Sequence, residues 1–214
     1  MHPFELHKAS SAAHAATLLG GKADGKFLAG GQSLLAAMKL RLNAPSDLID
    51  LASAVDLKGI KSDGKAVTIG AMTTHAEVAA SAEVQKAIPA LAALAASIGD
   101  RQIRNVGTLG GSLANNDPAA DYPAAVLGLG ATIQTNKRAI HADQFFRGMF
   151  DTALESGELI TAVSFPVPQK AAYFKFKNPA SRFAIIGVLA AQTTTGPRVA
   201  VTGGGAGVFR VADM

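Results

Sequence analysis

The hydrophobic and polar positions of this chain follow two periods, one typical of helices and one typical of strands. Apolar residues recur at helical spacing in segments that predict helices at residues 11–19, 34–42, 75–78, 82–97 and 124–129, with a helical turn at 143–146. Short apolar or alternating runs bounded by glycine, proline or Asp-Gly predict strands. These runs are residues 4–6, 27–29, 48–51, 57–61, 66–72, 132–134, 138–140 and 159–165.

The pattern changes after Pro166 and Pro168, which mark a boundary in the chain. Beyond them, residues 172–177, 183–193 and 198–202 are strand-like and separated by turns. This regular alternation predicts an antiparallel sheet at the end of the chain.

The longest predicted helix, residues 82–97, contains Pro89, which we expect to kink or break it. Its second half, residues 90–96, carries no charge on any face. A helix that is apolar all round is buried. We therefore expect it to pack in the core, with a subunit contact as the alternative.

Two glycine-rich segments are candidates for anion binding. The first, Gly107 to Asn115, combines glycine with small hydroxyls and is followed by Asp117 and Asp121. Such a segment can present backbone N–H groups as a concave anion site, although a mobile surface loop has the same composition. The second, Ala29 to Leu35, predicts a strand, a tight Gly-Gly turn and a helix capped by Ser33. It could also need glycine only for its turn.

Neither segment matches G-x-G-x-x-G, and no G-x-x-x-x-G-K-[ST] occurs in the sequence. Phosphates bound here would therefore be held by a route other than those two motifs.

The composition excludes several classes of protein. Hydrophobic residues make up 49% of the 214 residues and charged residues 17%, which predicts extensive burial and argues against disorder. The net charge of +4 is scattered, with no basic stripe interleaved with aromatics, so nucleic acid is not expected as a partner. No apolar run approaches the roughly 18 residues of a membrane span.

The absence of cysteine excludes disulfides, thiolate zinc sites and iron–sulfur ligation by this chain, and fits a cytoplasmic protein. The histidines, at positions 2, 7, 14, 75 and 141, show no metal-ligand spacing. No metal site is therefore expected.

Several motifs follow one another along the chain: residues 29–33 (AGGQS), 69–74 (IGAMTT), 102–112 (QIRNVGTLGGS), 117–123 (DPAADYP), 145–148 (FFRG), 158–160 (ELI) and 173–177 (YFKFK). This succession resembles the FAD-binding medium subunit of the molybdenum hydroxylases, the xanthine dehydrogenase and aerobic carbon monoxide dehydrogenase family. The likeness runs from Phe4 to about Val211.

The resemblance implies an α+β fold: the two-subdomain FAD-binding fold of the vanillyl-alcohol-oxidase/p-cresol-methylhydroxylase type, followed by a partial C-terminal sheet-containing domain. Residues 1–168 would be the FAD-binding region, split near residues 50–60. Residues 169–214 would begin the C-terminal flavoprotein domain, which we expect to be incomplete at Met214.

The resemblance also implies a set of FAD-binding residues: Ala29, Gly30, Gly31, Gln32, Ser33, Leu34, Thr108, Leu109, Gly110, Gly111, Ser112, Asn115, Asp117, Asp121, Ile160, Lys177 and Phe183. Backbone N–H groups of both glycine segments, with the Ser33 and Ser112 hydroxyls, are expected to bind the pyrophosphate. No residue of this chain is expected to be catalytic, because FAD carries the chemistry.

Individual residues in this set have structural alternatives. Asp121 would bind the ribose hydroxyls, or cap the helix that begins near Pro123. Asp117 would bind FAD, or open an Asp-Pro turn. Ile160 and Lys177 match positions that touch the flavin ring in relatives, although Lys177 could be a solvated strand residue. Phe183 stands where the carbon monoxide dehydrogenase subunit carries a tyrosine, so it keeps a ring without the hydroxyl.

By the same resemblance, this chain is an oxidoreductase subunit that passes electrons from [2Fe–2S] clusters of a small partner subunit through FAD to an external acceptor, which could be NAD, a quinone or oxygen. A large partner would carry a molybdenum–molybdopterin centre. We expect a dimer of heterotrimers in the cytoplasm, with association at the inner face of the membrane as an alternative. The alternatives are a self-contained flavin oxidase of the same fold and a cofactor-free interaction module.

Overall fold

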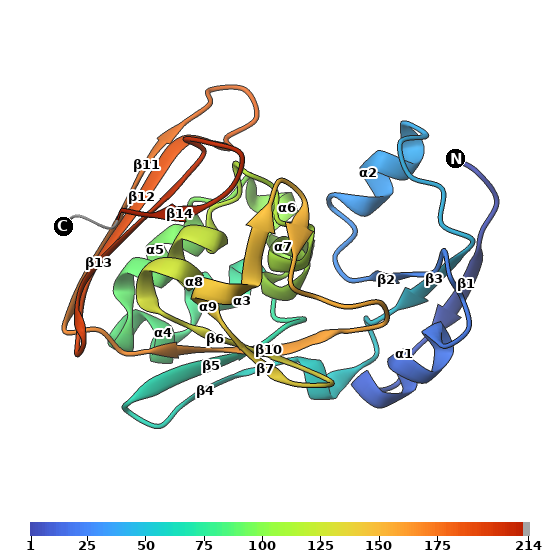
Figure 1. Cartoon of the computed structure of the whole chain (residues 1–214), viewed down its shortest axis with the longest axis horizontal. Helices are drawn as coiled ribbons and strands as arrows, with labels where there is room; N and C mark the ends of the chain where they lie inside the picture. Colours follow the sequence, from blue (N-terminus) through green and yellow to red (C-terminus); the bar gives the residue numbers. More distant parts are fainter. Residues whose placement is uncertain (212–214) are drawn as a thin grey trace.

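A computed structural model describes residues 1–211, arranged as three groups of elements (Figure 1). The N-terminal unit, residues 1–57, contains β1 (Glu5–Lys8), α1 (Ala12–Leu19), β2 (Lys26–Leu28), α2 (Leu34–Lys39), β3 (Asp47–Asp50) and η1 (Val55–Leu57). Its strands form a parallel sheet in the order β1-β3-β2. Ser11 caps the N-terminus of α1, because its side chain accepts a hydrogen bond from the N–H of His14.

Helix α2 is shorter than the predicted 34–42. It ends at Lys39, and Arg41 has a positive φ of 60°, which no helix continues through. The Ser33 side chain makes no capping hydrogen bond, although Ser33 stands at the cap position. The Ser33 hydroxyl therefore remains available to another partner.

The central unit is built on an antiparallel sheet of order β4-β5-β10-β6-β7. Its strands are β4 (Ile60–Ser62), β5 (Ala66–Gly70), β6 (Thr132–Thr135), β7 (Ala139–His141) and β10 (Ile160–Pro166). This unit also contains the helices α3 (His75–Ala80), α4 (Ala82–Ala87), α5 (Pro89–Ala96), α6 (Arg101–Val106), α7 (Leu109–Asn115), α8 (Tyr122–Leu129) and α9 (Ala142–Phe145). A hairpin of β8 (Phe146–Gly148) and β9 (Asp151–Thr152) belongs to it as well.

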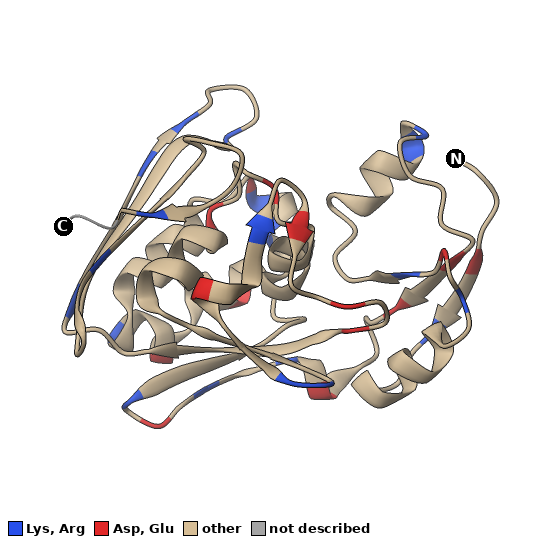
Figure 2. Ribbon diagram, in the orientation of Figure 1, with Lys and Arg blue, Asp and Glu red and all other residues tan. Residues whose placement is uncertain are grey.

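Pro89 breaks the predicted long helix into α4 and α5. Neither α5 nor α8 carries a charged residue (Figure 2). Every residue of α8 is buried, five of the eight residues of α5 are buried, and both helices contribute to the same core cluster. The core interpretation is therefore confirmed for most of residues 90–96, although Ala93 and Ala96 are exposed.

Residues 101–115 form α6 and α7, so most of the glycine-rich segment Gly107 to Asn115 is helical rather than the mobile loop that was its alternative. Side chains cap both helices: Asp100 accepts from the N–H of Ile103, and Thr108 accepts from the N–H of Gly111. Tertiary packing overrides the low helix propensity of glycine here. A Cβ on Gly110 would lie only 2.6 Å from Cβ of Ala71, so glycine is needed for close packing.

The last part of the chain forms an antiparallel sheet of order β11-β12-β13-β14, as the alternation predicts. Its strands are β11 (Lys170–Lys177), β12 (Ala184–Thr193), β13 (Gly196–Thr202) and β14 (Phe209–Arg210). Leu189 and Ala200 belong to the core cluster that contains α5 and α8, so one face of this sheet closes the central unit. The expectation about the chain at Met214 lies outside the described residues.

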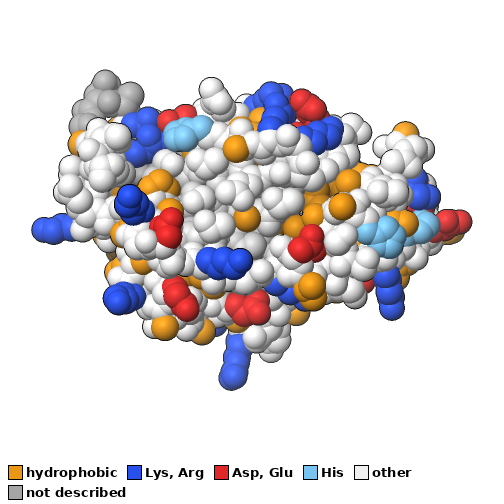
Figure 3. Space-filling model, turned by 90° about the horizontal axis from the view of Figure 1, so that it is seen from below, with side chains coloured by type: hydrophobic (Ala, Val, Ile, Leu, Met, Phe, Trp, Pro, Cys, Tyr) orange, Lys and Arg blue, Asp and Glu red, His pale blue; other side chains and the backbone are white. Residues whose placement is uncertain are grey.

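No helix among residues 1–211 is both long and apolar enough to cross a bilayer. On the face seen in Figure 3, basic and acidic side chains are interspersed. That face therefore lacks the single-sign basic patch of a nucleic-acid-binding surface.

Candidate functional site

A cavity of about 780 Å³ lies where the N-terminal unit, the central unit and the C-terminal sheet meet. The volume falls within the range of sites for small molecules and cofactors. Of the predicted site residues, the cavity is lined by Ala29, Gly30, Gly31, Gln32, Ser33, Leu34, Thr108, Gly110, Gly111, Ser112, Asn115, Asp117, Asp121, Ile160 and Phe183. The fold thus brings both glycine segments to one site.

The turn after β2 offers hydrogen-bond donors to the cavity. Gly31 has a φ of +69°, a conformation that favours glycine. Within residues 1–211, no acceptor is found for the backbone N–H groups of Gly30 to Ser33, while the Gln32 side chain donates to the carbonyl of Gly30. A cluster of free N–H groups beside a cavity is suited to an anionic group.

The second glycine segment does not offer donors in the same way, contrary to the prediction. The N–H of Leu109 donates to the carbonyl of Thr73, and the N–H of Gly110 donates to the carbonyl of Ala71. The N–H of Gly111 donates to the hydroxyl of Thr108, and the N–H of Ser112 donates to the backbone carbonyl of Thr108. This segment contributes space and the Ser112 hydroxyl instead.

Asp121 lies at the cavity wall, only 4% exposed, and does not cap α8 with its side chain. Its Oδ1 accepts from the hydroxyl of Tyr173 at 2.5 Å, and its Oδ2 accepts from Nζ of Lys175 at 2.8 Å. Burial raises the pKa of the Asp121 carboxyl, whereas these hydrogen bonds act in the opposite direction. The predicted capping alternative is therefore not what the structure has.

Asp117 was predicted to bind FAD or to open an Asp-Pro turn. It does stabilise a turn, because its Oδ1 accepts from the N–H of Ala119 at 2.8 Å. It also lines the cavity, so the two roles are compatible. Ile160 begins β10 at the cavity wall, and Phe183 lies in the connection between β11 and β12.

Two predicted site residues do not line the cavity. Leu109 is fully buried beneath the first turn of α7. Lys177 is exposed at the end of β11, where the pairing register shifts between Phe176 and Lys177. The shift breaks the alternation that would have put Lys175 and Lys177 on the same face. The structure therefore buries Lys175 against Asp121 behind the cavity wall, whereas Lys177 is exposed.

Sequence reasoning missed several residues of the site. Glu158 and His75 line the cavity and are buried. The Glu158 carboxylate accepts from both Nε and Nη2 of Arg138, each at 3.0 Å, and from the hydroxyl of Thr135. Although burial opposes ionisation, these hydrogen bonds and the one from the N–H of Glu155 hold the pKa of Glu158 at about 2.

His75 packs against the ring of Tyr122 with ring centroids 5.3 Å apart, and its Nδ1 has no partner within residues 1–211. Burial, with the nearby charge of Arg104, lowers the pKa of His75 to about 4. The ring is therefore neutral at pH 7. A period-based argument cannot find such a residue, because its position is decided by α3 packing against Gly107 and α8.

The hairpin of β8 and β9 stands at the cavity rim. Phe150 lines the cavity at the hairpin tip with a positive φ of 55°. Asn116 is buried and has a positive φ of 45°. Its side-chain Nδ2 donates to the carbonyls of Gly148 and Asp151, and its backbone carbonyl accepts from the N–H of Phe150. One buried asparagine thus fixes the conformation of the tip.

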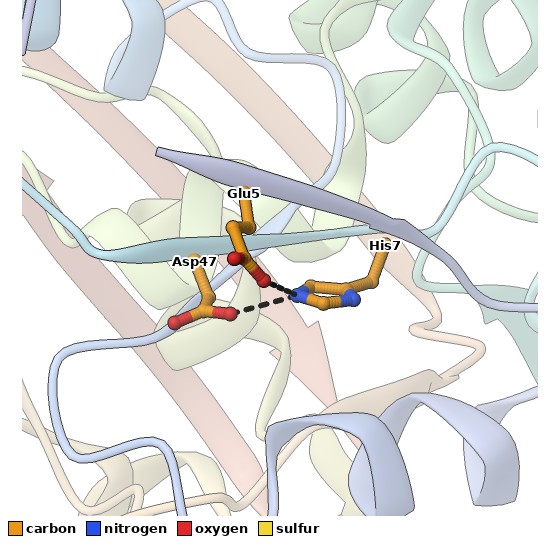
Figure 4. Close-up of side chains that lie close together, drawn as sticks. All are labelled: Glu5, His7 and Asp47. Atoms are coloured by element: carbon orange, nitrogen blue, oxygen red, sulfur yellow. Dashed lines mark hydrogen bonds and ion pairs between the residues drawn. The ribbon is translucent and has the colours of Figure 1, made fainter. Parts of the chain in front are cut away.

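Away from the cavity, Glu5, His7 and Asp47 lie together on β1 and β3 (Figure 4). His7 Nε2 is 2.7 Å from Asp47 Oδ1, and Nζ of Lys22 donates to the same oxygen at 2.7 Å. The hydrogen bonds from Lys22, Ser46 and His7 hold the pKa of Asp47 far below its usual value. A lysine already balances this carboxylate, so the cluster is a structural link between β1, β3 and the loop before β2.

These observations fit a large anionic cofactor. The free N–H groups of Gly30 to Ser33 and the hydroxyls of Ser33 and Ser112 are donors for phosphate oxygens, and Asp117 and Asp121 are acceptors for hydroxyls. A Cβ at Gly111 would lie 2.9 Å from Oγ1 of Thr108 and 3.4 Å from Cβ of Ala29, so glycine keeps the space open. Fold and site together fit the class of proteins that bind a large phosphate-bearing cofactor.

Comparison with known proteins specifies the class. Residues 2–168 match the family described as the FAD binding domain in molybdopterin dehydrogenase. The chain belongs to this family, and it is an FAD-binding oxidoreductase subunit. This confirms the family resemblance and the predicted α+β FAD-binding fold.

Individual relatives support the same assignment. The carbon monoxide dehydrogenase medium chain of Hydrogenophaga pseudoflava is 37% identical over 92% of this chain and 71% of its own length. The nicotine 6-hydroxylase medium subunit of Paenarthrobacter nicotinovorans is 37% identical over 93% and 74%. A solved structure of the Hydrogenophaga pseudoflava carbon monoxide dehydrogenase, lacking the Mo-pyranopterin moiety of its cofactor, aligns with a TM-score of 0.92 at 36% identity, covering 98% of this chain and 78% of that one.

Proposed function

We propose that this chain is the FAD-carrying electron-transfer subunit of a heterotrimeric molybdenum hydroxylase. The observation that supports it best is the single cavity lined by both glycine segments in a chain of this family. When bound, FAD supplies the redox chemistry, while the protein places and tunes it.

Different residues of the cavity would bind different parts of FAD. Gly30, Gly31, Gln32 and Ser33 would donate their free N–H groups to the pyrophosphate, with the Ser112 hydroxyl adding a donor. Asp117 and Asp121 would accept from hydroxyls of the sugar segments. Ile160 and Phe183 would contact the apolar ring system. Lys177 would reach the ring only if its exposed side chain turned toward the cavity.

The partners follow from what this chain lacks. None of the 214 residues is a cysteine, so none of them is a thiolate ligand of an iron–sulfur cluster, and in the proposed complex the electrons come from another chain. We propose a small [2Fe–2S] subunit as the donor and a large molybdenum–molybdopterin subunit as the site of substrate oxidation, in a cytoplasmic dimer of heterotrimers that could associate with the inner face of the membrane. The external acceptor is NAD, a quinone or oxygen.

The experiment is to purify the chain from its native source without dissociating its partners, and to measure flavin absorbance, iron, molybdenum and the identity of the co-purifying chains. We expect about one FAD per chain, a cysteine-rich small subunit and a large molybdenum subunit. A purified single chain that oxidised an organic substrate unaided would establish a self-contained flavin oxidase instead. A complex without flavin would indicate an interaction module.

A further inference from the structure

A buried ion pair lies directly behind the cavity wall. Asp121 Oδ2 accepts from Nζ of Lys175 at 2.8 Å, and both side chains are almost fully buried, 4% and 5% exposed. The hydroxyl of Tyr173 donates to the other carboxylate oxygen, and Nζ of Lys175 also donates to the carbonyl of Ser97 at 3.3 Å. The donors come from β11 of the C-terminal sheet, whereas Asp121 precedes α8 of the central unit.

Asp121 can contact a bound cofactor directly, whereas Lys175 and Tyr173 contact Asp121 from behind the cavity wall. Asp121 lines the cavity, but Lys175 and Tyr173 do not. Any influence of the lysine on a bound cofactor must therefore pass through the carboxylate. A carboxylate oxygen has about two acceptor sites, so each oxygen of Asp121 keeps one after accepting from β11.

Energetics explain why a cationic partner is needed. A buried carboxylate without a partner neutralises by taking up a proton, and a protonated acid loses acceptor capacity. A buried ion pair is weak evidence for stability, because desolvation offsets much of the attraction. The pair is better explained by what it does to the cavity: it keeps an acceptor charged and fixed in direction.

We propose that Lys175, assisted by Tyr173, is a positioning residue that keeps Asp121 ionised and oriented as an acceptor for a cofactor hydroxyl. The inference rests on the proposed FAD-binding function. It also gives the C-terminal sheet a part in the site, since β11 supplies both donors.

The groups that face Asp121 are few. Tyr173 and Lys175 lie on β11, and Tyr122 on α8 has its pKa raised by burial and by the charge of Asp121. The other titratable or charged residues that line the same cavity are Lys26, His75, Asp117, Glu158 and Arg182. Among them Lys175 is the cation in direct contact with the carboxylate, so its removal changes the protonation of Asp121 most directly.

The test is a double-mutant cycle of wild type, Lys175→Met, Asp121→Asn and the double variant, each in the intact complex. FAD affinity is measured by titrating FAD into apo-complex between pH 5 and 9, together with thermal unfolding of the apo-complex. Lys170→Met, an exposed lysine on the same strand, is the matched control.

We expect Lys175→Met to weaken FAD binding about tenfold or more, the size of one lost hydrogen bond to a charged group. The acid-side loss of affinity should also shift to higher pH, because the unpaired carboxyl protonates more easily. In the Asp121→Asn background, Lys175→Met should have little further effect on affinity, and Lys170→Met should have none.

Two results would overturn the positioning role while leaving FAD binding intact. One is that Lys175→Met weakens FAD binding equally in the wild-type and Asp121→Asn backgrounds. The other is that Lys175→Met keeps the wild-type FAD affinity and pH profile. Wild-type complex that binds no FAD would overturn the proposed function itself. A variant with too low a melting temperature is replaced by Lys175→Gln, to which the same outcomes apply.

Discussion

At the scale of single residues, the site is defined by which hydrogen-bonding groups are free and which are taken. The N–H groups of Gly30 to Ser33 have no acceptor within residues 1–211, whereas those of Leu109 to Ser112 all have one. Two glycine segments of similar composition therefore have different roles at the cavity. The first supplies donors to the cavity, and the second lets the chain pack closely around it.

Glu158 is expected to contribute to stability through its buried hydrogen bonds with Arg138 and Thr135. Glu158→Gln should lower the free energy of unfolding by about 1.5–3 kcal/mol at pH 7, the range for hydrogen bonds to a charged group. Denaturant unfolding measures this difference.

The sign of the pH dependence follows from the lowered pKa. The folded pKa of Glu158 is about 2, below its ordinary value of 4.5, so its contribution is full above pH 4.5 and is lost as the pH falls from about 4.5 toward 2. Wild type and Glu158→Gln should converge in stability over that window. A difference that stays constant down to pH 2 would contradict this assignment.

At the scale of elements, α7 shows how packing decides the conformation of a flexible sequence. The segment after Gly107 is hydrogen-bonded to residues 71–75, since the N–H of His75 donates to the carbonyl of Gly107 and the N–H of Gly110 donates to the carbonyl of Ala71. These contacts fix the first turn of α7 beside the cavity. On β11, a single shift of register likewise decides which lysine is buried.

The adjacent glycines of α7 should give separable phenotypes. Gly110→Ala should lower the free energy of unfolding by about 1–3 kcal/mol, because the new Cβ meets the backbone of Ala71, although alanine is the better helix former. Gly111→Val should instead reduce the FAD content, because its branched side chain enters the cavity beside Thr108 and Ala29. Denaturant unfolding and flavin absorbance measure the two effects. A folded Gly111→Val variant with full flavin content would refute the second.

At the scale of the whole molecule, the cavity exists because separate units meet. The N-terminal unit has its own small core, distinct from the larger core shared by the central unit and the C-terminal sheet. Gly30 lies at the junction, where an added Cβ would clash with the carbonyl of Val106 and lie 2.9 Å from Cα of Gly107. The division of the chain after residue 168 stays a prediction.

Gly30→Ala should therefore push the N-terminal unit away from α6 and α7. We expect a loss of about 1–3 kcal/mol in stability and a lower FAD content, because the donors of the turn after β2 move with that unit. Gly148→Ala is the matched control, since a Cβ there meets nothing within 4 Å and the variant should behave as wild type. Equal flavin content and melting temperature in both variants would show that the junction tolerates the methyl group.

The sequence by itself determined the order of most helices and strands, the burial of most of residues 90–96, the terminal antiparallel sheet and the family. These follow from local periodicity and from motifs read in order, which need no knowledge of distant contacts. Most of the site residues that it named do line the cavity, because the motifs carry them.

Only the tertiary structure decided which groups in that cavity are free. The hydrogen bond from the N–H of Gly110 to Ala71 and the pairing of Asp121 with Tyr173 and Lys175 depend on partners far along the chain. A hydrogen bond across more than 50 residues leaves no trace in local periodicity. The contacts of Asp121 with β11 therefore had to be found in the folded molecule.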